Sequence, residues 1–92
     1  MDLQKDSIRG EQAKRLLADP LLGEAFDTVA AALRAAWEAT GEAQERERER
    51  LWLMAKLLGR VKGHLVEALE TGRLADRQLA ALDMQRRTAD GD

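Results

Sequence analysis

Cysteine, tyrosine and asparagine are absent from this chain, and serine and histidine occur once each. Without cysteine, neither a disulfide nor a thiolate metal site can form, and this composition suits a reducing compartment. A Ser-His-Asp arrangement would require Ser7, close to the N-terminus, to reach His64. Glu67 follows His64 at a chelating i+3 spacing, but the chain contains no second pair of this kind. We therefore expect no catalytic residue, no metal site, no cofactor and no small-molecule substrate.

Long apolar runs and an excess of positive charge are missing as well. No uninterrupted apolar segment approaches the length of a membrane span, and the first residues lack the pattern of a signal peptide. The net charge is −2, so no overall positive field attracts nucleic acid. These absences predict a protein that does not bind a membrane, and they restrict nucleic-acid binding to a local patch.

Leucine and alanine, with 15 and 16 residues, supply a third of the chain, and charged residues supply 35%. Alanine, leucine, glutamate and arginine favour helices, whereas the β-branched residues that favour strands are few. The composition therefore predicts an all-α protein. We expect one domain over residues 1–92, with disordered ends at 1–6 and 88–92. A monomer of this length buries only about two-thirds of its unfolded surface, so assembly would add stability.

The clearest local signal is the segment ADPLL. Pro20 lacks an amide donor and suits the first turn of a helix, which Asp19 can cap. Proline also disfavours helical geometry at the residue before it, so the preceding helix must end there. We therefore expect a first helix over residues 7–18, with Ser7 as a candidate cap.

A second helix is expected over residues 20–40, ending at Gly41. Its apolar residues recur at steps of three and four, which places them on one continuous face: Leu22, Phe26, Val29, Leu33 and Trp37. The short turn at Gly41 then makes the following helix an antiparallel neighbour. The predicted fold is therefore a long antiparallel helical hairpin, flanked by two shorter helices.

The third helix is expected over residues 43–71, ending at Gly72, and a fourth over 74–87. The charged run that opens the third helix pairs opposite signs at i+3 and i+4, which favours a solvated helical turn over disorder. A coiled-coil-like three–four spacing follows, formed by Leu51, Met54, Leu58, Val61, Leu65 and Ala68. Further leucines make this apolar surface broader than a two-stranded seam needs, so we expect more than one neighbour.

One local excess of positive charge lies on the third helix, where no acidic residue occurs between Arg50 and Val66. Lys56, Arg60 and His64 recur every four residues and therefore share a face. Together with Arg50 and Lys62, they form a candidate contact for DNA phosphates or for an acidic partner. The alternative is that these residues form the solvated back of an amphipathic helix.

Small residues border this basic stripe. Ala55, Gly59 and Gly63 recur every four residues and leave a helix face almost without side chains. Glycine costs a helix about 1 kcal/mol relative to alanine, so we expect another helix to pack closely there. The alternative is a tolerated weak spot or slight kink. Trp37 and Trp52 lie near the turn, where we expect them to fill the core between the packed helices, with a role as interface anchors as the alternative.

The segments LLADPLLGEAF, AAW, RERLW and KGHL…TG carry a resemblance that covers about residues 9–74. The chain resembles a group of short helical proteins encoded by tailed bacteriophages and prophages. That resemblance implies a place in the head and DNA-packaging neighbourhood of a phage genome, and no functional residue carries over from it. In architecture, the hairpin is similar to those of ring-forming small terminase subunits, although this chain lacks a recognisable N-terminal DNA-binding domain.

We therefore expect a non-enzymatic phage structural or DNA-packaging and head-assembly protein that acts by self-association and partner binding through its hairpin. The expected partners are further copies of the chain, phage head or packaging proteins, and DNA at the basic stripe. The expected location is the host cytoplasm or the virion. The alternative function is a small phage regulatory or inhibitor protein that binds a host protein.

Overall fold

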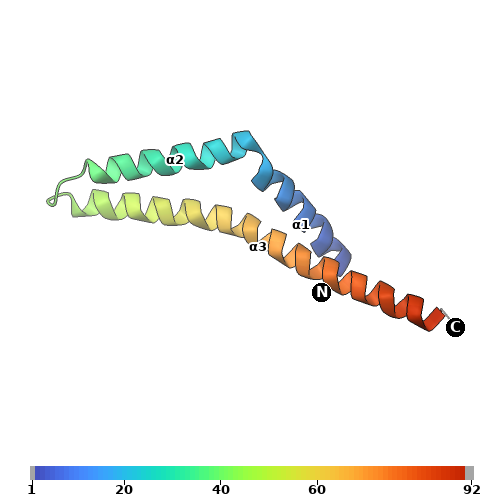
Figure 1. The fold of residues 1–92 in the computed structure, drawn as a ribbon. Coiled ribbons are helices and arrows are strands. Elements are labelled where there is room, and N and C mark those ends of the chain that lie inside the picture. The colour runs from blue at the N-terminus through green and yellow to red at the C-terminus, as the bar shows by residue number, and fades with distance from the viewer. Residues whose placement is uncertain (1, 91–92) are drawn as a thin grey trace. The chain divides into compact units, whose positions relative to one another are not determined.

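The computed structural model describes residues 2–90, and three α-helices contain nearly all of them (Figure 1). These helices are α1 (Leu3–Ala18), α2 (Pro20–Glu38) and α3 (Glu45–Asp90). Residues 2–90 contain no strand, so the predicted all-α fold class is confirmed. Within the same range, no helix has the combination of length and hydropathy that crossing a lipid bilayer requires.

The predicted boundary between the first two helices is confirmed. α1 ends at Ala18, and α2 begins at Pro20. Asp19 has extended backbone geometry, and its carboxylate oxygen Oδ1 accepts hydrogen bonds from the backbone N–H groups of Leu21 at 2.9 Å and Leu22 at 3.1 Å. These bonds satisfy two of the donors that every helix leaves free at its N-terminus.

The predicted start of α1 at Ser7 is wrong, because the helix begins at Leu3. Asp2 provides the cap instead, since its Oδ1 accepts a hydrogen bond of 3.0 Å from the backbone N–H of Lys5. Residues 3–6 and 88–90 of the ends expected to be disordered are therefore helical. Met1 and residues 91–92 lie outside the described residues.

The expected end of the third helix at Gly72 is also wrong. α3 is a single helix of 46 residues that passes through Gly72 and includes the fourth helix expected over residues 74–87. Gly72 ends a helix only if its neighbours leave helical geometry, and the residues after it are mostly strong helix formers. Gly72 has no positive φ, which distinguishes it from a helix-ending glycine.

Residue contacts divide the chain into two compact units that share α3. Unit 1 contains the described residues up to Leu16 and from Leu65 onward, and unit 2 contains residues 17–64. The single domain expected over residues 1–92 therefore includes two units with separate packing.

In unit 1, α1 crosses the later part of α3 at two glycines. Gly10 of α1 and Gly72 of α3 are both buried, and Ala13 and Ala75 beside them are each only 2% exposed. A Cβ atom added to Gly10 would lie 2.6 Å from the Cα atom of Gly72, which is closer than real Cβ contacts. The two helix backbones can approach this closely because neither glycine has a side chain.

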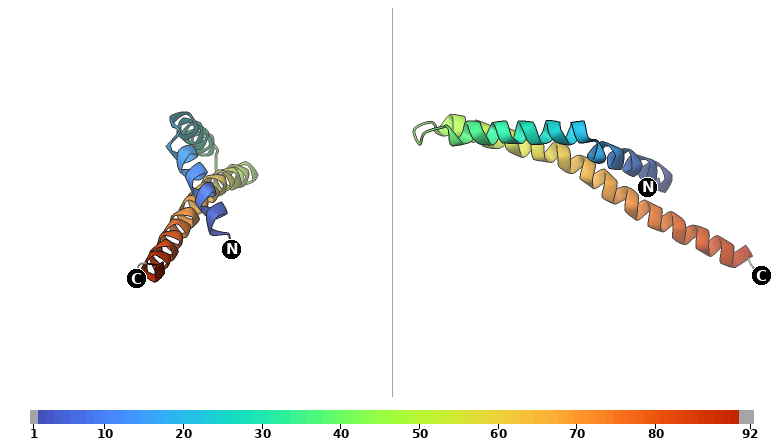
Figure 2. Two further views of the ribbon diagram at one scale, coloured as in Figure 1. Left: turned by 90° about the vertical axis from the view of Figure 1, so that its right-hand side faces the viewer. Right: turned by 45° about the horizontal axis from the view of Figure 1, so that its top comes forward.

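In unit 2, α2 and the first part of α3 lie side by side (Figures 1 and 2). Their shared interior is thin. Leu51 is buried, and four further large apolar side chains of these two helices are half-buried: Leu22, Phe26, Leu33 and Leu58. Met54 and Val61 of the predicted seam are 46% and 57% exposed, because they are turned away from α2. Less exposed residues of α3 recur every seven residues, at Leu51, Leu58, Leu65, Gly72 and Leu79, and Arg48, Ala68, Leu69 and Ala75 are less exposed as well.

Candidate partner-binding surfaces

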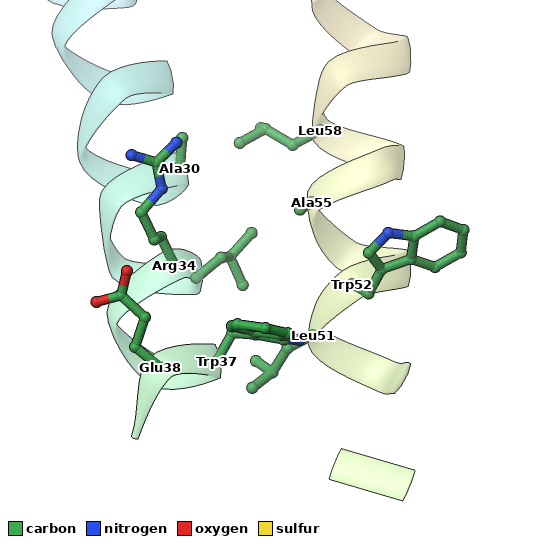
Figure 3. Close-up of a pocket in the computed structure, with 9 residues that line it drawn as sticks. Ala30, Arg34, Trp37, Glu38, Leu51, Trp52, Ala55 and Leu58 are labelled. Carbon is green, nitrogen blue, oxygen red and sulfur yellow. The ribbon is translucent and has the colours of Figure 1, made fainter. Parts of the chain in front are cut away.

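A groove of about 470 Å³ lies between α2 and the first part of α3 (Figure 3). Clefts of this volume commonly hold ligands or partner side chains in proteins. The lining is mostly apolar, with one cation and one anion on the α2 side. The lining residues are Ala30, Leu33, Arg34, Trp37, Glu38, Leu51, Trp52, Ala55 and Leu58. The groove therefore suits an apolar group that carries polar atoms at one edge.

The two tryptophans occupy different environments in this groove. Trp37 extends from α2 toward Leu51 of α3, whereas Trp52 points away from α2 (Figure 3). The guanidinium carbon of Arg48 lies 3.9 Å from the centre of the Trp37 ring, and the ammonium of Lys56 lies 5.1 Å from that of Trp52. Both distances allow cation–π attraction. Trp37 thus packs across the two helices but is 40% exposed, and Trp52 is 54% exposed on the surface. The expectation that both tryptophans fill the core is therefore wrong, because the layer of two helices is too thin to enclose them.

Of the five basic residues predicted as one contact surface, Lys62 lies on another side of α3 and Arg50 is paired with an acidic residue. Arg50 lies 4.0 Å from the carboxylate of Glu47, with both side chains largely exposed, an arrangement that contributes little stability. Lys62 lines a smaller cavity of about 160 Å³ that Asp27 of α2 also lines. The remaining three, Lys56, Arg60 and His64, are exposed residues of α3 at four-residue spacing. We use the term basic stripe for these three residues from here on.

The small residues Ala55, Gly59 and Gly63 do not contact another helix of this chain in the expected way. A Cβ atom added to Gly59 or Gly63 would meet nothing within 4 Å beyond its own helix. Ala55 and Gly59 instead line the cavity of about 160 Å³ beside α2. The close packing expected of the two glycines therefore does not occur within the chain. It stays a prediction for a partner.

The close glycine contact of this protein is at Gly10 and Gly72, which sequence reasoning missed. A signal was present, because each glycine has an alanine three residues later, Ala13 and Ala75. Small residues at helical spacing on both helices allow two backbones to approach. The hydroxyl of Ser7 also donates a hydrogen bond to the carboxylate of Asp76 at this crossing. Ser7 thus acts in a contact between helices.

The described part of the chain contains no group of three or more histidine, cysteine, aspartate or glutamate residues that could hold a metal ion. The surface feature that could bind a partner is a set of exposed apolar side chains. Leu21, Leu57 and Val61 are 73%, 58% and 57% exposed, although such side chains are usually buried in soluble proteins. Exposed apolar side chains that gather in a patch commonly mark sites of interaction with another protein.

Comparisons with known proteins do not assign the chain to a family. No protein-family model, no curated protein and no solved structure matches it.

Proposed function

We propose that this chain is a non-enzymatic structural or DNA-packaging and head-assembly protein of a bacteriophage. It acts by self-association and partner binding through a helical hairpin formed by α2 and the first part of α3. The observation that carries this proposal is the exposure of large apolar side chains. Among the described residues, the buried hydrophobic residues are only Ala13, Leu51 and Ala75.

Burial of these exposed side chains gives a physical reason for assembly. Removing one leucine or valine side chain from water contributes about 1.5–3 kcal/mol. The side chains of Leu57 and Val61 are each more than half exposed, so more than half of that contribution remains to be gained. A single layer of two helices cannot cover both of its faces, and stable domains contain at least two packed layers. A partner supplies the missing layer.

The resemblance to short helical phage proteins supports the assignment to head assembly or DNA packaging. On this proposal, the partners are further copies of the chain and other phage head or packaging proteins. DNA binds through the basic stripe of Lys56, Arg60 and His64, in which the lysine and arginine cations can neutralise phosphates. The protein acts in the host cytoplasm or in the virion.

The test is the mass of the purified protein, measured by light scattering over a range of concentrations with and without double-stranded DNA. We expect an oligomer, and a further increase in mass when DNA is added at low salt. The variant Lys56→Glu/Arg60→Glu should bind DNA more weakly while its circular dichroism stays helical, because it reverses two cations of the basic stripe. The proposal would be contradicted if the protein is a monomer at high micromolar concentration and its mass does not change when DNA or phage partners are added.

A matched control for this variant is available on the same helix. Arg73 and Arg77 are also exposed and four residues apart, so Arg73→Glu/Arg77→Glu makes the same change in charge at another place. DNA binding that depends on the basic stripe should survive in this control. Equal loss in both variants would indicate that only net charge matters.

A second candidate function is the binding of a host protein as a regulator or inhibitor. The groove between α2 and α3 favours it, because Trp37, Trp52 and Arg34 line that groove and tryptophan and arginine are enriched among binding hot spots. The test is a pull-down from host lysate with the wild-type protein and with Trp52→Ala. A single host protein that is captured by the wild type and lost with the variant would support this function.

A further inference from the structure

Unit 2 carries an unpartnered apolar face on the side of the layer that lies away from the groove. Large apolar side chains from both helices form this face, and all of them are exposed by 46% to 73%: Leu21, Val29, Met54, Leu57 and Val61. Three exposed alanines of α2, at positions 25, 32 and 36, lie on the same face as Leu21 and Val29. We call this surface the apolar face.

Helical geometry places both halves of the apolar face on the same side of the layer. On α2, Val29 lies less than about a quarter turn from the residues that contact α3, and on α3, Met54 and Val61 lie about a quarter turn from those that contact α2. Both offsets have the same rotational sense. Because the two helices run in opposite directions (Figure 1), residues that are offset in the same rotational sense lie on the same side of the two-helix layer. Residues that are offset in the opposite rotational sense, such as Arg34 and Trp52, lie on the other side of the layer, where they line the groove.

The size of the apolar face fits a specific protein interface. α2 has 19 residues, which corresponds to roughly 28 Å, and two adjacent helices are roughly 20 Å wide. The face therefore covers about 550 Å² on one copy, and two copies together would bury about 1,100 Å². Biological interfaces usually exceed about 1,000 Å² in total.

The net charges of the two helices favour one orientation of a second copy. α2 carries three acidic residues and one arginine, whereas residues 45–64 carry six lysines and arginines and three glutamates. Asp27 and Glu38 of α2 line the cavities on the opposite side of the layer, so these charges do not meet a partner directly at the apolar face. Acting through the layer, they still make α2 of one copy on α3 of the other the arrangement that brings helices of opposite net charge closest, whereas stacking like helices brings like net charges together. The first arrangement also makes all neighbouring helices antiparallel, as in many four-helix bundles.

We infer that a second copy of this chain covers the apolar face with its own apolar face, in a four-helix bundle with two-fold symmetry. Each α2 lies on α3 of the other copy, and both connecting loops lie at the same end. This inference rests on the self-association proposed above and names the surface and orientation that produce it.

The residues that line the groove show which positions of α2 and α3 lie at the same height along the helix axes. The groove places Ala30 of α2 together with Ala55 and Leu58 of α3. By helical rise, Ala32 is then level with Met54 of α3, and Val29 is level with Leu57. A two-fold axis parallel to the helices keeps these heights, so Ala32 of one copy meets Met54 of the second copy.

Disulfide cross-linking tests this arrangement directly, because the natural chain contains no cysteine. The single-cysteine variants Ala32→Cys and Met54→Cys are mixed in equal amounts, refolded together and oxidised. We expect a covalent mixed dimer from the mixture and little covalent dimer from either variant alone. The mixture of Val29→Cys with Leu57→Cys provides a second pair at another height. Ala31→Cys mixed with Met54→Cys is the control, because Ala31 lies on another face of α2.

Light scattering on the same samples distinguishes self-association itself from the particular arrangement inferred here. An oligomer that cross-links through either pair, and not through the control, supports the inference. An oligomer without either cross-link, or one in which Met54→Cys cross-links efficiently to itself, overturns the inference and leaves self-association intact. A monomer at every concentration overturns both.

Discussion

Replacing Gly72 with alanine tests the helix crossing in unit 1. The added methyl group would lie 2.5 Å from the Cα atom of Gly10 and 3.0 Å from the backbone oxygen of Asp6. These are backbone atoms of α1, so they cannot swing aside as the end of a flexible side chain can. α1 must therefore move away from α3 by about 1 Å or more to restore ordinary van der Waals contact.

The net effect combines three contributions of known sign. Forcing an extra methyl group into a tight contact costs about 1–3 kcal/mol. Separation of the helices also exposes the methyl groups of Ala13 and Ala75, each 2% exposed and each worth about 0.8 kcal/mol when buried. Against this, replacing glycine with alanine inside a helix contributes about 1 kcal/mol. Because a shift of about 1 Å exposes these two methyl groups only in small part, we expect Gly72→Ala to destabilise the protein by about 1–2 kcal/mol.

Gly63→Ala is the matched control, because an added Cβ there meets nothing within 4 Å beyond its own helix. This variant should be more stable than the natural protein by about 1 kcal/mol. The melting temperatures of the two variants should then differ by about 10 °C, since 1 kcal/mol corresponds to about 4–8 °C in a domain of this size.

Thermal unfolding followed by circular dichroism measures this difference, at one protein concentration because self-association makes melting concentration-dependent. Hydrogen exchange of the α1 amides provides a local measurement, and Gly72→Ala should lower their protection. If Gly72→Ala raises the melting temperature as much as Gly63→Ala, the close crossing does not exist in solution and the reasoning is refuted.

Three further predictions concern unit 2 and its N-terminal boundary. Gly59→Leu should raise stability by about 0.7 kcal/mol by helix propensity and leave the oligomeric mass unchanged, because Gly59 is away from the apolar face; a lower mass by light scattering would show that another copy packs on it. Trp37→Ala should cost about 2 kcal/mol in urea unfolding and Trp52→Ala about 1 kcal/mol or less, because only Trp37 packs across the two helices; equal losses would contradict this difference. Asp19→Ala should cost about 1 kcal/mol by loss of the α2 cap, and an unchanged unfolding midpoint would count against that cap.

Much of the secondary structure could be predicted from the sequence, because its causes act within a few residues. The stop at Ala18, the cap at Asp19 and the start at Pro20 follow from the φ angle and missing donor of proline and from one carboxylate. The charged run from residue 45 is helical, as its spacing indicated. The prediction failed at Gly72, because a glycine with the same local signal can end a helix or continue one.

The candidate surfaces were only partly predictable. Periodicity showed which residues share a face of one helix, and it therefore grouped Lys56, Arg60 and His64 correctly as exposed residues of α3. It could not show that Lys62 lines a cavity beside Asp27, because this placement depends on how α2 is rotated about its axis. For the same reason, Trp37 and Trp52 looked equivalent in the sequence and differ in the structure.

What the sequence by itself determined is the all-α character and the position of the α1–α2 boundary, since propensity, capping and proline geometry are local properties. The tertiary structure decided which glycines mediate close contact. Gly59 and Gly63 have the more conspicuous spacing, yet Gly10 and Gly72 bring two backbones together. These two glycines lie far apart in the chain, and their contact depends on where α1 crosses α3. In unit 2, the way α2 packs on α3 leaves Met54 and Val61 exposed, and the apolar face is therefore uncovered within the chain.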